Sequence, residues 1–141
     1  MVSGLPPAQL SPGIRWLLLS PIGRLSRKVY WYGLAFNWVI IAIAANMWMK
    51  SLPGDVDLAS LTFGDFMGSN PLFPVLFVVV TWFEMALLIK RLQDVGLPGF
   101  FALVAFVPVI NFFAVLTLGF LPSAQGPNRY GPQPDSYYRR R

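Results

Sequence analysis

The side chains of this 141-residue sequence that could carry out chemistry are few, and the chain has neither histidine nor cysteine. Without imidazole or thiolate groups, the usual zinc, haem and copper sites and histidine acid–base catalysis are excluded. Six carboxylates remain, and they are scattered along the chain: Asp55, Asp57, Asp65, Glu84, Asp94 and Asp135. We therefore expect no cofactor, no metal ion and no enzymatic activity. A membrane enzyme is a remote alternative that would need two carboxylates beside one cavity.

One carboxylate could still form a site with an arginine. Glu84 lies inside a long apolar stretch, where a charged side chain is costly and often marks a proton or cation site. Arg91 follows seven residues later, so on a helix it lies on the same face as Glu84. We predict a direct or water-mediated interaction between them. It is interpreted either as a proton or cation site or, preferably, as a charge neutralised by its own helix.

Three asparagines also lie in apolar stretches, at positions 37, 46 and 111. Side-chain hydrogen bonds from Asn37, Asn46 and Asn111 could hold helices together, each contributing about 0.5–2 kcal/mol. Gly33 and Asn37 are four residues apart, so they would share one helix face. We interpret the asparagines as packing residues rather than as the lining of a pore.

The elements that position these residues follow from composition. Hydrophobic residues make up 55% of the chain and charged residues only 12%, which is too apolar a balance for a soluble protein. Apolar stretches cover residues 31–49, 72–89 and 100–121, and each is long enough to cross a hydrocarbon core of about 30 Å as a helix. The sequence therefore predicts an all-α membrane protein with three transmembrane helices.

The third stretch has two possible forms because it contains Pro108. In one form, residues 100–121 cross the membrane once with a kink at the proline. In the other, residues 108–111 are the tip of a re-entrant hairpin that returns the C-terminus to its starting side. We favour the single crossing, because distant C-terminal charges orient a chain more weakly than charges beside the first helix.

The predicted domain organisation is simple. Residues 1–13 read as a flexible lead, residues 14–134 as one membrane domain, and residues 135–141 as a basic, disordered tail. Within the membrane domain, residues 14–22 are too short to span and are expected to lie in the membrane interface, with Trp16 dipped into it.

Charges predict the orientation. Arg24, Arg27 and Lys28 directly precede the first span, which favours a cytoplasmic N-terminus and attraction to anionic lipid headgroups. The expected partners are the lipid bilayer, further copies of the chain or other membrane proteins. Because flanking charges account for the net charge of +5, no nucleic-acid partner is expected.

A charged hinge at residues 90–99 separates the second and third apolar stretches. Arg91 and Asp94 are three residues apart, so they can pair at the end of a helix. Gly96 allows the chain to leave the helix, and Pro98 prevents its continuation. A helix stop and a turn therefore explain most of the hinge.

This hinge is the second of three ordered motifs. They read Gly23-Arg24-Leu25-Ser26-Arg27-Lys28 followed by Tyr30-Trp31, then Lys90-Arg91-Leu92-Gln93-Asp94-Val95-Gly96 followed by Gly99-Phe100, then Gly126-Pro127-Asn128-Arg129-Tyr130-Gly131-Pro132. In order and spacing, the chain resembles the domain of unknown function 805 family of small bacterial inner-membrane proteins. The resemblance covers residues 20–134. It implies a location in the bacterial inner (cytoplasmic) membrane and no particular activity.

The family pattern also implies one polar cluster at a membrane face. The expected members are Arg24, Arg27, Arg91, Gln93, Asp94, Asn128 and Arg129. Gln93 stands where the family usually has histidine and Lys90 where it has arginine, so any chemistry of the family's imidazole is missing here. Glutamine can still donate and accept hydrogen bonds. If all three motifs do meet, the re-entrant hairpin gains support.

Three functions are compatible with these features. We favour a non-catalytic scaffold, regulatory or assembly component of the inner membrane. The alternative is an oligomeric component for transport or for handling anionic lipids, which would use Glu84 and Arg91. A membrane enzyme is the remote third possibility.

Overall fold

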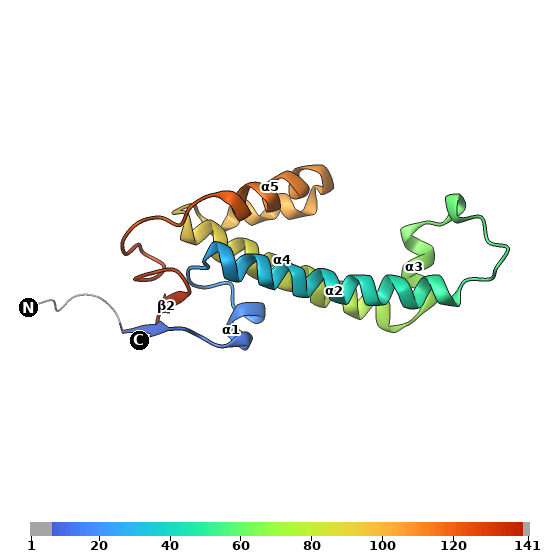
Figure 1. The fold of residues 1–141 in the computed structure, drawn as a ribbon, viewed down its shortest axis with the longest axis horizontal. Coiled ribbons are helices and arrows are strands. Elements are labelled where there is room, and N and C mark those ends of the chain that lie inside the picture. The colour runs from blue at the N-terminus through green and yellow to red at the C-terminus, as the bar shows by residue number, and fades with distance from the viewer. Residues whose placement is uncertain (1–6, 140–141) are drawn as a thin grey trace, which may run out of the picture.

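Two long antiparallel helices form the axis of the computed structural model, which describes residues 7–139 (Figure 1). They are α2 (Arg27–Ser51) and α4 (Leu72–Asp94), and both are long and apolar enough to cross a membrane. A shorter apolar helix, α5 (Pro108–Phe120), lies beside the end at which α2 begins and α4 finishes, and the two ends of the described chain lie there too (Figure 1). We call this end, which holds Arg27 and Asp94, the clamp-side end. The protein is therefore mostly helical, with two long apolar helices and one shorter one.

Helices α2 and α4 approach each other closely at one small residue. A Cβ atom added at Gly33 would lie 2.7 Å from Leu87 Cδ2, so a larger residue here would force the Leu87 side chain to move. One turn further along α2, buried Asn37 donates from Nδ2 to the carbonyl oxygen of Val80 on α4 at 3.2 Å. Gly33 and Asn37 therefore lie on the face of α2 that contacts α4.

The connection between the long helices contains η1 (Leu58–Ser60) and α3 (Phe63–Ser69). A capping box begins α3: Thr62 accepts from the backbone N–H of Asp65, and the Asp65 carboxylate accepts from the Thr62 hydroxyl and N–H. The hydrogen bond from the Thr62 hydroxyl, followed by the bond from the Thr62 N–H, lowers the pKa of Asp65 below its usual value. The Phe66 ring stacks on Phe73 at 4.6 Å and fastens α3 to the start of α4.

The third apolar stretch is a helical hairpin. It consists of the 3₁₀ helix η2 (Gly99–Phe106) and α5, which turn back on each other at Val107 (Figure 1). The hairpin returns to the end of α4, where the Ala124 N–H donates to the Asp94 carbonyl at 3.1 Å.

The expectation of one continuous crossing over residues 100–121 is therefore wrong, and the alternative hairpin is the observed geometry. The turn precedes Pro108, because proline lacks an N–H donor and fits the first position of a helix. The 13 residues of α5 extend only about 20 Å, which is short of a hydrocarbon core of about 30 Å.

The two ends of the described chain pair with each other. Strand β1 (Ala8–Leu10) runs antiparallel to β2 (Ser136–Tyr138). This pairing corrects the flexible lead and the disordered tail expected for residues 1–13 and 135–141, of which residues 1–6 and 140–141 lie outside the described residues. The tail is fixed because Arg24 N–H donates to the Ser136 carbonyl at 2.8 Å and Asp135 N–H donates to the Arg24 carbonyl at 2.9 Å.

The segment expected in the membrane interface forms the short helix α1 (Ile14–Leu19). Its Trp16 points into the protein rather than outward, since only 9% of this residue is exposed and its ring stacks on Tyr137. The Trp16 indole also donates to the Ile22 carbonyl at 2.7 Å. Contacts with the returning C-terminal strand, which the local sequence does not reveal, therefore turn Trp16 inward.

We expect Gly119→Ala to destabilise the protein by about 1–3 kcal/mol through overpacking. A Cβ atom at this position of α5 would lie 2.2 Å from the Trp31 ring, whose Nε1 donates to the Gly119 carbonyl. Thermal unfolding of the detergent-purified protein measures the effect. Gly68→Ala is the matched control, because Gly68 is also helical and has nothing within 4 Å of its added Cβ. Equal melting temperatures for the two variants would contradict the prediction.

Candidate functional site

A buried carboxylate between two arginines lies at the clamp-side end of α4. Asp94 accepts from Arg24 Nε through Oδ1 at 3.0 Å and from Arg91 Nη1 through Oδ2. All three side chains have no exposed surface. Arg91 and Asp94 come from the last turn of α4, whereas Arg24 comes from the loop before α2. The first two sequence motifs therefore meet in one ion-paired group.

The remaining donors of Arg24 bind the third motif and the segment before it. Arg24 Nη2 donates to the Ala124 carbonyl at 2.6 Å. Its Nη1 donates to the carbonyls of Gly126 and Gly131 at 2.6 and 3.3 Å. A guanidinium has five donors in a fixed fork, and here the fork holds together the loop before α2 and the C-terminal segment.

Arg91 holds the end of α5 in the same way. Its Nε donates to the Leu118 carbonyl at 2.8 Å, and Nη2 donates to the Leu121 carbonyl. These are among the last carbonyls of α5, which have no partner within the helix. The negative end of the α5 dipole also favours a cation there. Arg91 therefore caps α5 and fixes the hairpin against α4.

Gln93 connects to the first motif with its side chain and to the third with its backbone. Its Oε1 accepts from the Gly23 N–H at 3.0 Å, and its Nε2 donates to the Pro21 carbonyl at 3.2 Å. Asn128 Nδ2 donates to the Gln93 carbonyl at 2.9 Å. We name these five residues the polar clamp: Arg24, Arg91, Gln93, Asp94 and Asn128.

Two residues of the expected cluster lie outside the polar clamp. Arg27 is exposed and donates to the Phe120 carbonyl at 3.4 Å. Arg129 is exposed and lies over the Tyr130 ring at 4.7 Å. Both arginines therefore lie at the protein surface and not in the buried ion-paired group.

Comparison with known proteins agrees with the three motifs. The family described as "Protein of unknown function (DUF805)" matches residues 18–132. The chain belongs to the DUF805 family. Inner membrane protein YhaI of Escherichia coli strain K12 is 30% identical to this chain over 113 residues, which cover 79% of this chain and 83% of YhaI. YhaI of E. coli O157:H7 matches with the same identity and coverage. No solved structure matches the chain.

This DUF805 member has one further buried cation, Lys90, which sequence reasoning missed. Lys90 Nζ donates to the carbonyls of Trp16, Leu17 and Ser20 at 3.0, 2.7 and 2.5 Å. These carbonyls form the C-terminal end of α1, which has no basic residue in its own last turn. The acceptors are backbone carbonyls of another helix, which no residue type marks, so the sequence carries no signal for this contact.

We expect Lys90→Met to detach α1 from α4. Removing the ammonium leaves three carbonyls without their charged donor, at a cost of about 1.5–3 kcal/mol. Hydrogen exchange of residues 14–20 should speed up while exchange in α4 stays slow. Lys28→Met is the control, because Lys28 is exposed at the start of α2. Unchanged exchange in α1 would show that Lys90 does not hold this helix.

The DUF805 chain has a second polar group within its apolar helices. Asn111 Nδ2 on α5 donates to Glu84 Oε1 on α4 at 2.8 Å, and Asn111 Oδ1 is buried with no partner in the described part of the chain. The direct form of the predicted Glu84–Arg91 interaction is absent from the described residues, because Arg91 turns to Asp94 and to the end of α5. Asn46 is exposed near the far end of α2 and lies apart from both polar groups.

The polar clamp joins segments of the chain to one another through hydrogen bonds and ion pairs. Its charged donors and acceptors bind one another and backbone carbonyls of the same chain. Within residues 7–139, no group of three or more His, Cys, Asp or Glu side chains could hold a metal ion. The clamp therefore fixes three segments of this DUF805 protein in one arrangement.

Proposed function

We propose that this DUF805 member is a non-catalytic component of the bacterial inner membrane that scaffolds, regulates or assembles membrane proteins, either other proteins or further copies of itself. One observation carries the proposal: Arg24, Arg91 and Asp94 have no exposed surface and bind groups of their own chain. Such charges maintain a shape rather than contact a substrate. The relative YhaI, an inner membrane protein, supports the location.

The surface available for assembly is apolar and rich in aromatic side chains. Exposed residues on α2, α4 and α5 present it, among them Phe36, Trp38, Phe77, Val78, Phe112 and Phe113. In a bilayer, such side chains face either lipid tails or the helices of another protein. We infer that one of these faces contacts a partner helix.

Photo-cross-linking in native membranes tests the assembly. A photoreactive amino acid is placed at Trp38, Val78 or Phe113, which are each more than half exposed on different helices. We expect discrete protein adducts from at least one position, and mass spectrometry then tells a second copy from another protein. The same amino acid at Ser60, in the exposed η1 connection, is the control. The proposal would be overturned if all three helix positions gave lipid adducts and none gave a protein adduct.

We also propose that the chain crosses the membrane twice, through α2 and α4, with both termini cytoplasmic. Basic residues collect at the clamp-side end, which carries Arg15, Arg24, Arg27, Lys28, Lys90, Arg91 and Arg129. The opposite connection has Lys50 against Asp55, Asp57 and Asp65. Excess Lys and Arg favours the cytoplasmic side, and the β1–β2 pairing places the two ends together.

A reporter at the C-terminus tests this orientation. We expect a fluorescent protein that folds only in the cytoplasm to be bright when fused there. We expect alkaline phosphatase, which folds only outside the inner membrane, to be inactive at the same place. A phosphatase inserted between α2 and α4 should be active. An active C-terminal phosphatase would contradict two crossings.

The Glu84–Asn111 pair favours a second candidate, the movement of a proton or cation by an oligomer. The observation behind it is that Glu84 accepts a hydrogen bond from Asn111, whose buried Oδ1 has no partner within residues 7–139. Flux into vesicles reconstituted with the wild-type protein is compared with flux for Glu84→Gln. Equal flux would remove this candidate. Arg91 has no role in this transport candidate, since its side chain is bound to Asp94 in the polar clamp.

A further inference from the structure

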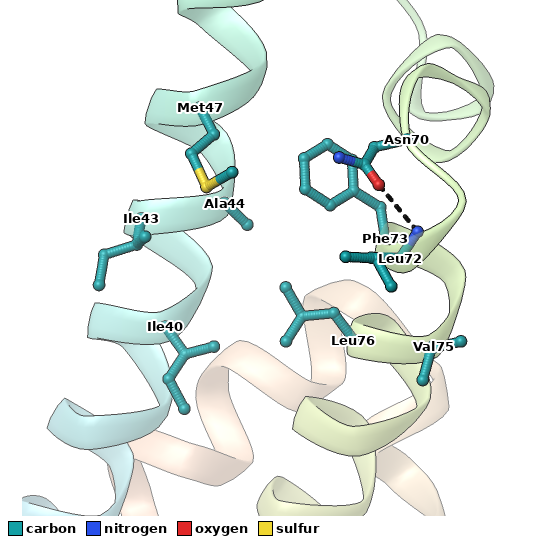
Figure 2. Close-up of a pocket in the computed structure, with 9 residues that line it drawn as sticks. All are labelled: Ile40, Ile43, Ala44, Met47, Asn70, Leu72, Phe73, Val75 and Leu76. Carbon is teal, nitrogen blue, oxygen red and sulfur yellow. Dashed lines mark hydrogen bonds between the residues drawn. The ribbon is translucent and has the colours of Figure 1, made fainter.

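An apolar groove separates α2 from α4 near their α3-side ends. The helices touch at Gly33 and Leu87, but further along they face each other across a space of about 400 Å³ (Figure 2). Its walls include Ile40, Ile43 and Met47 from α2 and Phe73 and Leu76 from α4. In Figure 2, Ala44 of α2 and Phe73 and Leu76 of α4 point toward this space, whereas Ile43 and Val75 point to the outer sides of their helices. The groove is therefore open at the apolar surface of the two candidate spans.

One side-chain amide, that of Asn70, lines the groove, and Lys50 lies one helical turn beyond the groove wall on α2. Asn70 Oδ1 accepts from the Leu72 N–H at 2.9 Å, which fixes the orientation of the amide. The Asn70 nitrogen then points across the groove toward α2 (Figure 2). Lys50 follows Met47 by three residues on α2, so the two residues share one helix face. Within residues 7–139, Lys50 forms no salt bridge.

We propose that this groove binds one acyl chain of a zwitterionic phospholipid, whose phosphate contacts Asn70 Nδ2 and Lys50. Water is a poor occupant because the walls offer it few polar partners. Transmembrane helices satisfy their backbone acceptors internally, so another helix would leave the two donors unused. A phospholipid supplies an apolar chain at the depth of the helices and phosphate oxygens at their ends.

The net charge of the connection between α2 and α4 indicates which phospholipid headgroup fits the groove. This connection carries Asp55, Asp57 and Asp65 and no basic residue beyond Lys50. The connection therefore has a net negative charge, which disfavours a headgroup that is itself negatively charged. Phosphatidylethanolamine offers a phosphate to the donors and an ammonium to the acidic loop. It therefore fits this mouth better than phosphatidylglycerol, which has no cation.

Native mass spectrometry tests the proposal on the full chain released from nanodiscs that contain equal amounts of phosphatidylethanolamine and phosphatidylglycerol. We expect one phosphatidylethanolamine to remain bound per chain. In Asn70→Asp, the acceptor for Leu72 N–H stays while the amide donor becomes a negative oxygen. Retention should then fall by roughly tenfold, the size of one lost charge-assisted contact. Ser60→Asp adds the same charge in exposed η1 and should leave retention unchanged.

A second variant tests the apolar part of the groove. Ala44→Leu adds volume from α2 into the groove and should displace the acyl chain without changing any charge. Loss of the lipid in Asn70→Asp and Ala44→Leu, with retention in Ser60→Asp, supports the site. The proposal is overturned if both variants keep the lipid, if Ser60→Asp loses it equally, or if phosphatidylglycerol is retained as well as phosphatidylethanolamine.

Discussion

Replacing Asp94 with asparagine is expected to lower the stability of the folded protein by about 3–5 kcal/mol. The substitution keeps the size of the side chain but removes the only carboxylate that faces Arg24 and Arg91 in the described residues. Two guanidinium groups without exposed surface then lack a counter-charge. The asparagine amide also places two N–H donors where two arginines already donate, so one oxygen must serve both.

The Asp94→Asn effect is measured by thermal unfolding in detergent or lipid nanodiscs. Asp55→Asn is the control, because Asp55 is exposed in the loop after α2, and its effect should stay within about 0.5 kcal/mol. A coupled effect should appear when Asp94→Asn is combined with Arg24→Gln, since the second change removes one of the unpaired cations. Wild-type stability for Asp94→Asn would refute the structural role of the polar clamp.

Replacing Arg91 with methionine is expected to cost a similar 3–5 kcal/mol, but with a different local signature. The variant keeps the apolar stem and loses the donors to Leu118, Leu121 and Leu25. Asp94 keeps its bond to Arg24, so the loop before α2 stays attached. The hairpin of η2 and α5 should therefore loosen before the rest of the molecule.

Hydrogen exchange resolved by segment distinguishes the two variants. In Arg91→Met, exchange should rise mainly in residues 99–121, whereas in Asp94→Asn it should rise at the clamp-side end as a whole. Arg91→Lys retains the charge but not the planar fork, so it should restore only part of the stability. Arg129→Met, which alters an exposed arginine, should leave exchange in the hairpin unchanged. Uniform exchange in α5 across these variants would show that Arg91 does not hold the hairpin.

The sequence predicts the parts of this fold that local patterns specify. Long apolar runs predict α2 and α4, because backbone groups in a bilayer must be satisfied within a helix. The spacing of Arg91 and Asp94 predicts their pairing, and the three motifs place Arg24 and Asn128 in the same group. These signals concern residues on one helix or in one family pattern.

Contacts with backbone groups that are distant in the sequence could not be predicted from local patterns. Lys90 binds carbonyls of α1, and Arg91 binds carbonyls of α5, but every residue has a carbonyl, so no residue type marks these acceptors. The Glu84–Asn111 pair depends on the turn at Val107, which sets where α5 lies beside α4. The β1–β2 pairing joins opposite ends of the chain, and short polar strands carry little pattern of their own.

Arg24 binds residues that are made much later during synthesis, and this separation sets the order in which its contacts can form. Its carbonyl partners Ala124, Gly126 and Gly131 follow it by 100 to 107 residues. At about 5–20 residues per second, a ribosome needs roughly 5–20 s after Arg24 to reach the last of them. Asp94 follows Arg24 by 70 residues, so the carboxylate is made before these three carbonyls. A chain cut short before Asp94 lacks the counter-charge of Arg24, and one cut short between Asp94 and Ala124 has the counter-charge but lacks the three carbonyls, which distinguishes both from a finished molecule.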